Sequence, residues 1–423
     1  MIGRVPEQRK ASLARVRDPF TGETIDEALA LWFPGPKSET GEDMAELQLH
    51  GGRAVVTAVL TALGKLDGLR MAEPGEFTRR AFENGRLDLT AVEGLADLIY
   101  AETEAQRRQA YRQLKGLLGE RAETWRARLI EALALIEARI DFSDEADVPE
   151  DLIGPALAIA QTLREEIAEA LAGAARGERL REGLVVAIAG PPNAGKSTLF
   201  NRIAQREAAI VSPIPGTTRD VIEVHLDLNG YPVTVLDTAG MRESNDPVER
   251  EGVRRAQMRA NDADLVLWVV EAGSAMDRTQ IHFMDAHRQG DQEVWLVQSK
   301  ADLINHNKAA RVINEQELQF TNMSLVSAAT GEGVNQLMNQ ISMNVAQFFG
   351  GGEGAVVTRE RHRKALEETL EALDRAAKEG HAGREDIIAE ELRLASRALG
   401  RLTGRVDVED ILDVIFRDFC IGK

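Results

Sequence analysis

The residues best suited to chemistry lie between Gly190 and Ser197, in the segment Gly-Pro-Pro-Asn-Ala-Gly-Lys-Ser. This segment has the spacing of a phosphate-binding loop, in which glycines let backbone N–H groups close around phosphate oxygens. A lysine at the position of Lys196 reaches the terminal phosphates, and the hydroxyl of Ser197 is suited to hold Mg²⁺. The pattern therefore predicts a site for a nucleoside triphosphate.

The flanking sequence supplies the elements that such a loop requires. Residues 184–189 form a short apolar run that predicts a buried strand, and Leu199, Phe200 and Ile203 follow the loop at helical spacing. A helix that begins here points its partial positive charge at the phosphates. The residues assigned to this loop are Asn193, Ala194, Gly195, Lys196, Ser197 and Thr198.

Two later segments complete the phosphate side of the site. Asp237 follows a predicted strand at 233–236 and is suited to hold Mg²⁺ through water, while the N–H of Gly240 can meet a γ-phosphate. Residues 212–220 combine hydroxyls with Gly and Pro, as expected of a switch that γ-phosphate and Mg²⁺ order. From these segments we assign Ser212, Pro213, Ile214, Pro215, Gly216, Thr217, Thr218, Asp237, Thr238, Ala239 and Gly240 to nucleotide binding.

The base is expected to be guanine. Asp302 follows a predicted strand at 294–297, and its carboxylate can accept hydrogen bonds from N1–H and the 2-amino group, a donor pair that adenine lacks. GTPases usually have Asn-Lys-x-Asp here, whereas this chain has Ser299; because serine is shorter, we expect part of the contact to the base or to the phosphate loop to be lost. The residues assigned to the base side are Ser299, Lys300, Ala301, Asp302, Ser327, Ala328 and Ala329.

Met241 stands where Ras-like GTPases carry the glutamine that positions the attacking water. Methionine cannot form such hydrogen bonds, so hydrolysis requires another group to orient water and another cation to stabilise the transition state. The candidates for catalysis are Glu249, Arg219 and Arg242.

Length and composition describe an ordinary globular chain of several domains. With 423 residues and a net charge of −18, the chain is acidic, which argues against nonspecific nucleic-acid binding but leaves room for a local basic patch. The single cysteine, Cys420, excludes an internal disulfide and suits a reducing, cytoplasmic location. The apolar runs are far shorter than a membrane span, so no membrane association is expected.

The pattern along the chain predicts a multidomain α/β protein. Short strands at 28–33, 46–50 and 68–71 with a helix at 55–63 indicate a small α+β domain over 1–84. Helical spacing follows over 85–180, strands alternate with helices over 181–350, and helices return over 351–423. Asn229-Gly230 predicts a hairpin. The simplest architecture is a doubly wound P-loop domain inserted into an all-helical domain.

Several long motifs resemble the MnmE (TrmE) family of tRNA modification GTPases, and the resemblance covers nearly the whole chain. They are LWFPGP at 31–36, TGEDMAELQLHGG at 40–52, the segment 74–99, GPPNAGKSTLFN at 190–201, GTTRD at 216–220, DTAGMRE at 237–243 and the terminal Cys-Ile-Gly-Lys.

This resemblance implies a homodimeric GTPase that works with the FAD protein MnmG, as a heterotetramer of two plus two chains. Together they add an aminomethyl-type group, including carboxymethylaminomethyl, at carbon 5 of the wobble uridine of certain tRNAs. The one-carbon unit comes from a 5-formyl or 5,10-methylene type of tetrahydrofolate. The resemblance also implies activation by K⁺, held by Asn193, Ser212, Ile214 and Thr217, with Mg²⁺ on Ser197 and Thr218. Glu249 would orient the attacking water through a second water.

The resemblance implies that folate is held by Glu46, Arg86 and Lys423, which match the folate-binding residues of the family, with Cys420 close by. Family members also carry an N-terminal strand and a glycine-rich run, with an arginine of the folate site, that this sequence does not contain. Either the start codon is misassigned or the protein is truncated. If the segment is truly absent, we expect the folate-binding domain to lack one strand, which weakens folate binding and dimerisation through that domain.

Two other functions fit parts of the sequence. One is a GTP-switched factor in ribosome assembly of the Era type, which would lack the motifs at 40–99 and 420–423 and would carry a basic RNA-binding domain. The other is a folate-binding protein with a vestigial GTPase, which Ser299 and the missing segment suggest.

Overall fold

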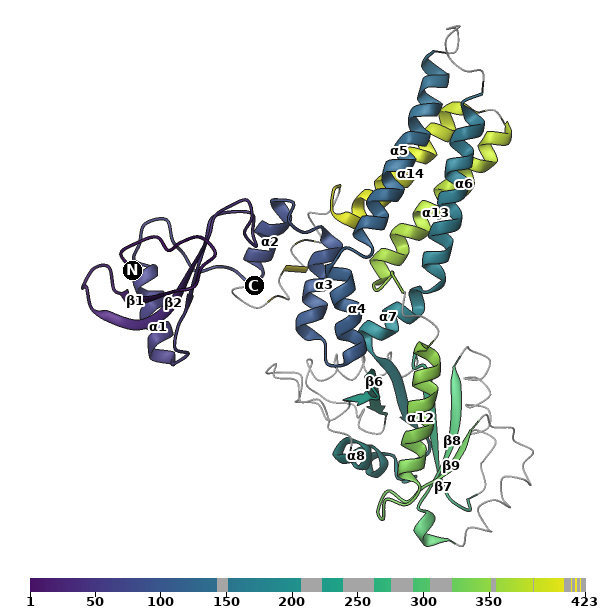
Figure 1. Ribbon diagram of the computed structural model, residues 1–423. Coiled ribbons are helices and arrows are strands. Elements are labelled where there is room, and N and C mark those ends of the chain that lie inside the picture. Colours follow the sequence, from purple (N-terminus) through teal and green to yellow (C-terminus); the bar gives the residue numbers. More distant parts are fainter. Residues whose placement is uncertain are drawn as a thin grey trace, which may run out of the picture. The chain divides into compact units, whose positions relative to one another are not determined.

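The computed structural model describes residues 1–142, 151–206, 223–238, 262–274, 292–304, 322–350, 355–382 and 384–406, together with 412, 415, 416 and 419. The chain divides into two compact units (Figure 1). Unit 1 comprises residues 1–99, 111–167 and 364–423, and unit 2 comprises residues 100–110 and 168–363. The described residues contain no helix that is long and apolar enough to cross a membrane.

The N-terminal part of unit 1 is a three-stranded antiparallel sheet covered by one helix. The strands β1 (Ser12–Arg17), β2 (Thr24–Phe33) and β3 (Met44–Gln48) lie in chain order. Helix α1 (Arg53–Leu63) packs on one face, where Val16, Ala28 and Val59 form a buried cluster. The strands predicted around residues 28–33 and 46–50 are therefore confirmed, and the sequence pattern missed β1.

The strand predicted at 68–71 is wrong. This segment has no strand structure, and the side chains of Leu69 and Met71 are 51% and 59% exposed. Arg70 instead pairs with Glu76 at 2.7 Å, in the first turn of α2 (Glu76–Glu83). Without a neighbouring strand to cover its apolar side chains, the segment remains an irregular connection.

The helical part of unit 1 is built from sequence segments on both sides of unit 2. It includes α3 (Leu89–Tyr100), α5 (Gly119–Asp141) and α14 (Glu385–Thr403), with portions of α4 (Glu104–Leu114), α6 (Ile153–Ala172) and α13 (Glu360–Ala382). Figure 1 shows α5, α6, α13 and α14 side by side. This arrangement is the interrupted helical domain expected from the sequence.

The pairing of α5 with α14 follows from a repeat of apolar residues every three or four positions. In α5 the buried side chains are Ala122, Trp125, Leu129, Ala132 and Ile136. In α14 Ile388, Leu392, Ala395, Leu399 and Leu402 are buried at the same spacing. Such a stripe buries one side of each helix against its neighbour.

Polar contacts fix how α6 and α13 join this pair. Glu166 of α6 accepts hydrogen bonds from Trp125 Nε1 and Arg128 Nη1 of α5, both at 2.8 Å. Arg164 of α6 forms an ion pair with Asp374 of α13. Gly380 of α13 leaves no room for a Cβ, which would lie 2.4 Å from Leu157 Cδ1. These contacts set the register in which the helices pack.

Unit 2 contains a six-stranded sheet in the order β5-β6-β4-β7-β8-β9. The strands are β4 (Leu184–Ala189), β5 (Glu223–Leu228), β6 (Tyr231–Asp237), β7 (Leu265–Glu271), β8 (Glu293–Ser299) and β9 (Met323–Leu325). All neighbours are parallel except β5 and β6. That pair is the predicted hairpin, and positive φ angles of 56° at Asn229 and 88° at Gly230 form its turn.

Both faces of this sheet are buried, as the continuous apolar strands require. On one face Ile188, Leu267 and Val297 join a cluster with α8 (Lys196–Arg206) and α12 (Val334–Phe349). On the other, Ala187 and Trp268 belong to a second buried cluster. Helix α7 (Ala174–Glu182) leads into β4. The expected multidomain α/β fold class is confirmed, whereas the exact domain boundaries stay predictions.

Replacing Leu129 by alanine should lower the free energy of unfolding of the helical part by about 2–5 kcal/mol, because it leaves a cavity in the α5–α14 contact. Its neighbour Ile130 is 45% exposed, so Ile130→Ala is the matched control and should change stability by about 0.5 kcal/mol. Amide hydrogen exchange of α5 and α14 measures both effects. Equal loss of protection in the two variants would contradict the buried seam.

Candidate nucleotide-binding site

The predicted phosphate loop lies where the strand order of the unit 2 sheet reverses. Strand β4 has β6 on one side and β7 on the other, and all three run parallel. Their carboxyl ends therefore meet at one edge, which is the position at which open α/β sheets bind ligands. The loop at 190–195 leaves β4 at this edge and leads directly into α8.

The loop backbone adopts conformations that glycine and asparagine accept more readily than other residues do. Gly190, Asn193 and Gly195 have φ angles of 140°, 60° and 90°. A Cβ on Gly190 would lie only 2.1 Å from the carbonyl oxygen of Val269 in β7, so this position requires glycine. The close approach holds the start of the loop against the neighbouring strand. The loop and the helix N-terminus together have the strand–loop–helix arrangement that suits an anion.

The ammonium of Lys196 is held inside this loop. Its Nζ donates hydrogen bonds to the carbonyls of Gly190 and Pro191 at 2.8 and 2.7 Å, and the residue is 8% exposed. Burial lowers the pKa of Lys196, and the nearby Asp237 carboxylate opposes that shift. The cation is thus positioned at the mouth of the loop, where a phosphate oxygen can replace the carbonyls as its partner.

Asp237 and Ser197 bring oxygen ligands to the same edge. Asp237 ends β6, is 3% exposed, and pairs in the sheet with Ile188 of β4. Ser197 lies exposed in the first turn of α8. The next residue after Asp237, Thr238, donates its hydroxyl to the carbonyl of Ile188 at 2.8 Å and fixes this strand end. Hydroxyl and carboxylate oxygens suit Mg²⁺, which completes its octahedral coordination with water and phosphate.

The structure therefore fits Mg²⁺ without a dedicated protein cage. Among the described residues, no group of three or more His, Cys, Asp or Glu side chains is arranged to hold a metal ion. A nucleotide-linked Mg²⁺ does not need such a group, because phosphate oxygens and waters supply most of its ligands.

The base side of the site lies at the end of β8. Asp302 is exposed within a short 3₁₀ turn, η1 (Ala301–Leu303). Its Oδ1 accepts a hydrogen bond of 2.6 Å from the hydroxyl of Ser327, a fully buried residue. The Ser327 hydroxyl also accepts the N–H of Thr330 at 3.2 Å. One carboxylate oxygen is thus anchored, which orients the exposed carboxylate for a pair of donors.

Lys300 and Ala301 are fixed by their own partners. The ammonium of Lys300 lies 2.7 Å from Glu271 Oε2, at the end of β7. The N–H of Ala301 donates to the carbonyl of Val326 at 3.1 Å. The intermediate Ala328 and exposed Ala329 follow Ser327 in the adjoining turn. The predicted base-side residues are therefore brought together by β7, β8 and the loop after β9.

Ser299 reaches the phosphate loop despite its short side chain. The residue is 3% exposed, and its hydroxyl lies 2.5 Å from the carbonyl oxygen of Ala194 and 3.0 Å from that of Val270. The contact to the loop that we expected serine to weaken is present in this structure. Ala194 and Val270 are partners that the sequence could not indicate, because they lie 105 and 29 residues away.

Many of the predicted site residues lie outside the described residues. These are Ser212, Pro213, Ile214, Pro215, Gly216, Thr217, Thr218, Arg219, Ala239, Gly240, Arg242, Glu249, Cys420 and Lys423, and Met241 is also among them.

The two described residues of the predicted folate site lie in the N-terminal part of unit 1. Glu46 is exposed on β3, opposite Leu31 of β2. Arg86 is exposed in the segment after α2, which packs on the loop before β3: a Cβ on Gly41 would lie 3.3 Å from Arg86 Cγ. The structure thus connects the two segments without giving a direct contact between the two charges.

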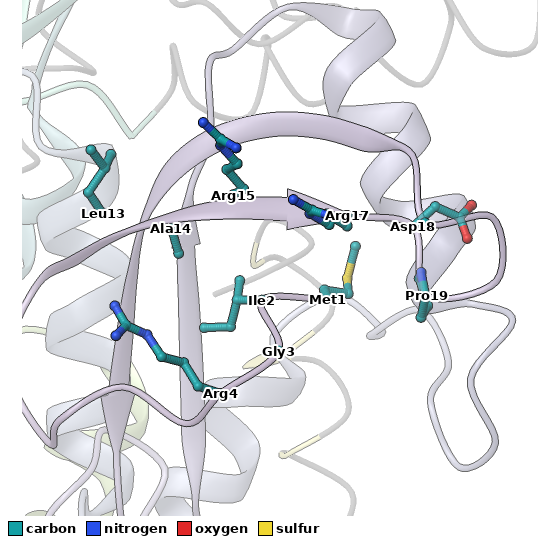
Figure 2. Close-up of a pocket in the computed structure, with 11 residues that line it drawn as sticks. Met1, Ile2, Gly3, Arg4, Leu13, Ala14, Arg15, Arg17, Asp18 and Pro19 are labelled. Carbon is teal, nitrogen blue, oxygen red and sulfur yellow. The ribbon is translucent and has the colours of Figure 1, made fainter.

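The same part of the chain carries a hollow that the sequence did not indicate (Figure 2). It has a volume of about 620 Å³ and is lined by the first four residues, by part of β1 and by the turn after it. Arg4, Arg15 and Arg17 lie around it, whereas neither Glu46 nor Arg86 lines it.

Comparison with known proteins matches two parts of the chain to two family models. The family model "MnmE helical domain" matches residues 89–420, and the model "GTP-binding protein TrmE N-terminus" matches residues 2–86. Proteins described as tRNA modification GTPase MnmE from Bradyrhizobium sp., Rhodopseudomonas palustris and Azorhizobium caulinodans are 55%, 56% and 55% identical. Each comparison covers 100% of this chain and 92% of the relative.

The chain belongs to the MnmE family. The resemblance found in the sequence motifs is therefore confirmed. Within this MnmE family member, the helical match that continues across unit 2 agrees with a nucleotide-binding domain inserted into the helical part.

Gly190→Ala should lower the free energy of unfolding of unit 2 by roughly 2–4 kcal/mol, because the new Cβ meets the Val269 carbonyl in addition to the strain of a positive φ. Gly273→Ala is the matched control: its φ is 80°, but the nearest atom to its Cβ is 3.7 Å away. The control should lose only about 1–2 kcal/mol. Urea unfolding measures both losses, and equal values would contradict the close approach of the strands.

Proposed function

We propose that this chain is a GTP hydrolase that acts in the modification of tRNA. The observation that carries the proposal is a single sheet edge that presents a phosphate loop with a buried lysine and, at the end of β8, a carboxylate oriented by a buried serine. Family membership supports the same activity, because the relatives are tRNA modification GTPases by name.

Guanine selection is assigned to Asp302. An ionised carboxylate only accepts hydrogen bonds, and guanine offers N1–H and the 2-amino group as adjacent donors. The Ser327 hydroxyl holds one oxygen of Asp302 in place while the residue stays exposed. A pair of charge-assisted hydrogen bonds would favour guanine over adenine, whose corresponding edge lacks this donor pair.

Phosphate binding and Mg²⁺ are assigned to the loop and its neighbours. Lys196 would exchange its two loop carbonyls for phosphate oxygens, and the loop N–H groups would surround the β-phosphate. Ser197 and Thr218 would hold Mg²⁺ directly and Asp237 through water. Bound there, Mg²⁺ neutralises charge that develops on the phosphates during transfer.

We assign catalysis mainly to residues that lie outside the described part of the chain. Among the described residues, Asn193 supports this assignment. Asn193 is exposed at the phosphate loop, with a φ of 60° that turns the backbone at this point. We propose that its side chain, with Ser212, Ile214 and Thr217, holds a K⁺ ion that supplies positive charge beside the transferring phosphate. Glu249 would orient the attacking water in place of Met241, and Arg219 and Arg242 are further candidates.

The role in tRNA modification rests on the family and on the N-terminal part. We propose that the chain forms a homodimer, joins the FAD protein MnmG as a two-plus-two heterotetramer, and modifies carbon 5 of the wobble uridine in the cytoplasm. A tetrahydrofolate derivative would supply the carbon, bound by Glu46, Arg86 and Lys423 near Cys420. The exposure of Glu46 and Arg86 supports a ligand-facing role.

The proposed division of the chain supports this assignment of roles. Residues 1–84 would bind folate, 181–350 would bind GTP, and 85–180 with 351–423 would form the helical domain. The two compact units of the structure and the two family-model matches support this order.

Asp302→Asn should weaken GTP binding by roughly 10- to 100-fold, because an amide replaces one acceptor by a donor. Xanthosine triphosphate carries a carbonyl in place of the 2-amino group, so the variant should bind it more tightly than the original protein does. Competition against a fluorescent nucleotide measures both affinities. Ser327→Ala is the control: it loses the anchor and should weaken GTP without gaining xanthosine triphosphate. Unchanged base preference in Asp302→Asn would place guanine selection elsewhere.

GTP turnover should be at least about tenfold faster in KCl than in NaCl at equal ionic strength, because the bound K⁺ replaces a catalytic cation. Asn193→Ala should remove most of this difference while GTP affinity stays within a few-fold. Phosphate release under steady-state conditions gives the rates. Equal, slow rates in both salts would overturn the K⁺ assignment but leave GTP binding intact.

A further inference from the structure

Ser299 ends strand β8 at the point where three parts of the nucleotide site meet. Its hydroxyl lies between the carbonyl of Ala194 in the phosphate loop, at 2.5 Å, and that of Val270 in β7, at 3.0 Å. The main chain also joins the ends of β7 and β8 here, because the N–H of Ala272 donates to the carbonyl of Ser299 at 2.9 Å. One small side chain therefore joins the phosphate loop to the strand that leads into the base-side turn.

This arrangement uses the only proton that the Ser299 side chain can donate. A hydroxyl has a single O–H, and both of its neighbours are carbonyl acceptors. The residue is 3% exposed, so a base at the surface of the site has little access to it. Ser299 is consequently oriented toward the protein interior and offers no donor to a bound nucleobase.

The remaining side chains of this turn leave one edge of guanine without a partner. Guanine has donors at N1 and the 2-amino group, and acceptors at O6 and N7. The ionised carboxylate of Asp302 can only accept, so it serves the donor edge. The ammonium of Lys300 is paired with Glu271 at 2.7 Å. Within residues 299–302, the donor groups of Ser299 and Lys300 are thus both engaged by oxygens of the protein.

The geometry points to a divided role for this segment, which rests on the proposed GTP-binding function. Asp302 recognises guanine through N1–H and the 2-amino group, while Ser299 is a positioning residue that holds the phosphate loop relative to the base. The nucleotide specificity that follows is unusual: the site discriminates strongly at the 2-amino group and hardly at N7. Analogues altered at N7 are accepted as ligands.

Binding of two analogues to the unmodified protein tests the specificity. The triphosphate of 7-deazaguanosine, which has C–H in place of N7, should bind within about twofold of GTP. Inosine triphosphate, which lacks the 2-amino group, should bind about tenfold or more weakly, the effect of one charge-assisted hydrogen bond. Competition against a fluorescent GTP analogue measures the three affinities. A loss of tenfold or more for the 7-deaza compound would overturn the inference.

Two variants test the role of Ser299 itself. Ser299→Ala should weaken GTP and the 7-deaza compound by the same factor, several-fold, and should leave the weak affinity for guanosine within twofold, because guanosine has no phosphates for the loop to bind. Ser299→Asn introduces an amide donor and should create a preference for GTP over the 7-deaza compound. If Ser299→Ala lowers guanosine and GTP affinity alike, or changes the ratio of GTP to the 7-deaza compound, the positioning role is wrong.

The affinities of these nucleotides also distinguish a failure of this inference from a failure of the proposed GTPase function. If GTP, inosine triphosphate and ATP bind equally, or none binds, the proposed guanine-specific GTPase is wrong and the inference fails with it. If GTP binds selectively but N7 matters, only the inference fails. Thermal unfolding of each variant without nucleotide, expected to match the original protein within a few degrees, verifies that the fold is kept.

Discussion

The close approach of strands β4 and β7 is the constraint on which the nucleotide site depends. The carbonyl of Val269 occupies the space in which a side chain on Gly190 would begin. Because glycine has no side chain, the chain can pass close to β7 as it leaves β4. The loop that follows then turns back far enough for the Lys196 ammonium to meet the carbonyls of Gly190 and Pro191.

Short polar contacts at the strand ends preserve this geometry. The hydroxyl of Thr238 fastens the end of β6 to β4, and that of Ser299 fastens the end of β8 to the phosphate loop. Ser327 then fixes Asp302 on the far side. Ser299 and Ser327 are buried and Thr238 is half-buried. Away from water a hydrogen bond is stronger and an unpaired polar group is costly. Hydrogen bonds thus hold the candidate site at the positions proposed to bind phosphate and base.

Local patterns predicted most of the fold. The apolar runs of β4, β7 and β8 were evident because strands buried on both faces are continuous in hydrophobic residues. The Asn229-Gly230 turn was evident because few residues accept two positive φ angles. Strand β1 was missed because charged residues interrupt it: Arg15 forms an ion pair with Glu27 across the sheet on the exposed face. Segment 68–71 resembled a strand because Leu69 and Met71 alternate with the polar Arg70, but both apolar side chains are exposed and no strand forms.

Site residues could be predicted where a motif is contiguous and not where partners are distant. The phosphate loop and Asp302 follow fixed spacings, so their positions at the sheet edge were expected. The contact of Ser299 with Ala194 joins residues 105 positions apart, and the hollow beside β1 is formed by the chain's first residues and a strand that had not been predicted. Such contacts depend on tertiary packing, which local sequence does not encode.

The helical part of unit 1 also has a consequence for the order of events during synthesis. The ion pair of Glu137 with Arg393 closes a span of 256 residues. At the usual rate of translation of about 5–20 residues per second, α5 waits roughly 10–50 s for α14 to be made. During that time the apolar stripe of Trp125, Leu129 and Ile136 has no permanent cover. The nascent chain therefore has to be protected from aggregation until α14 leaves the ribosome, while the inserted unit can fold in the interval.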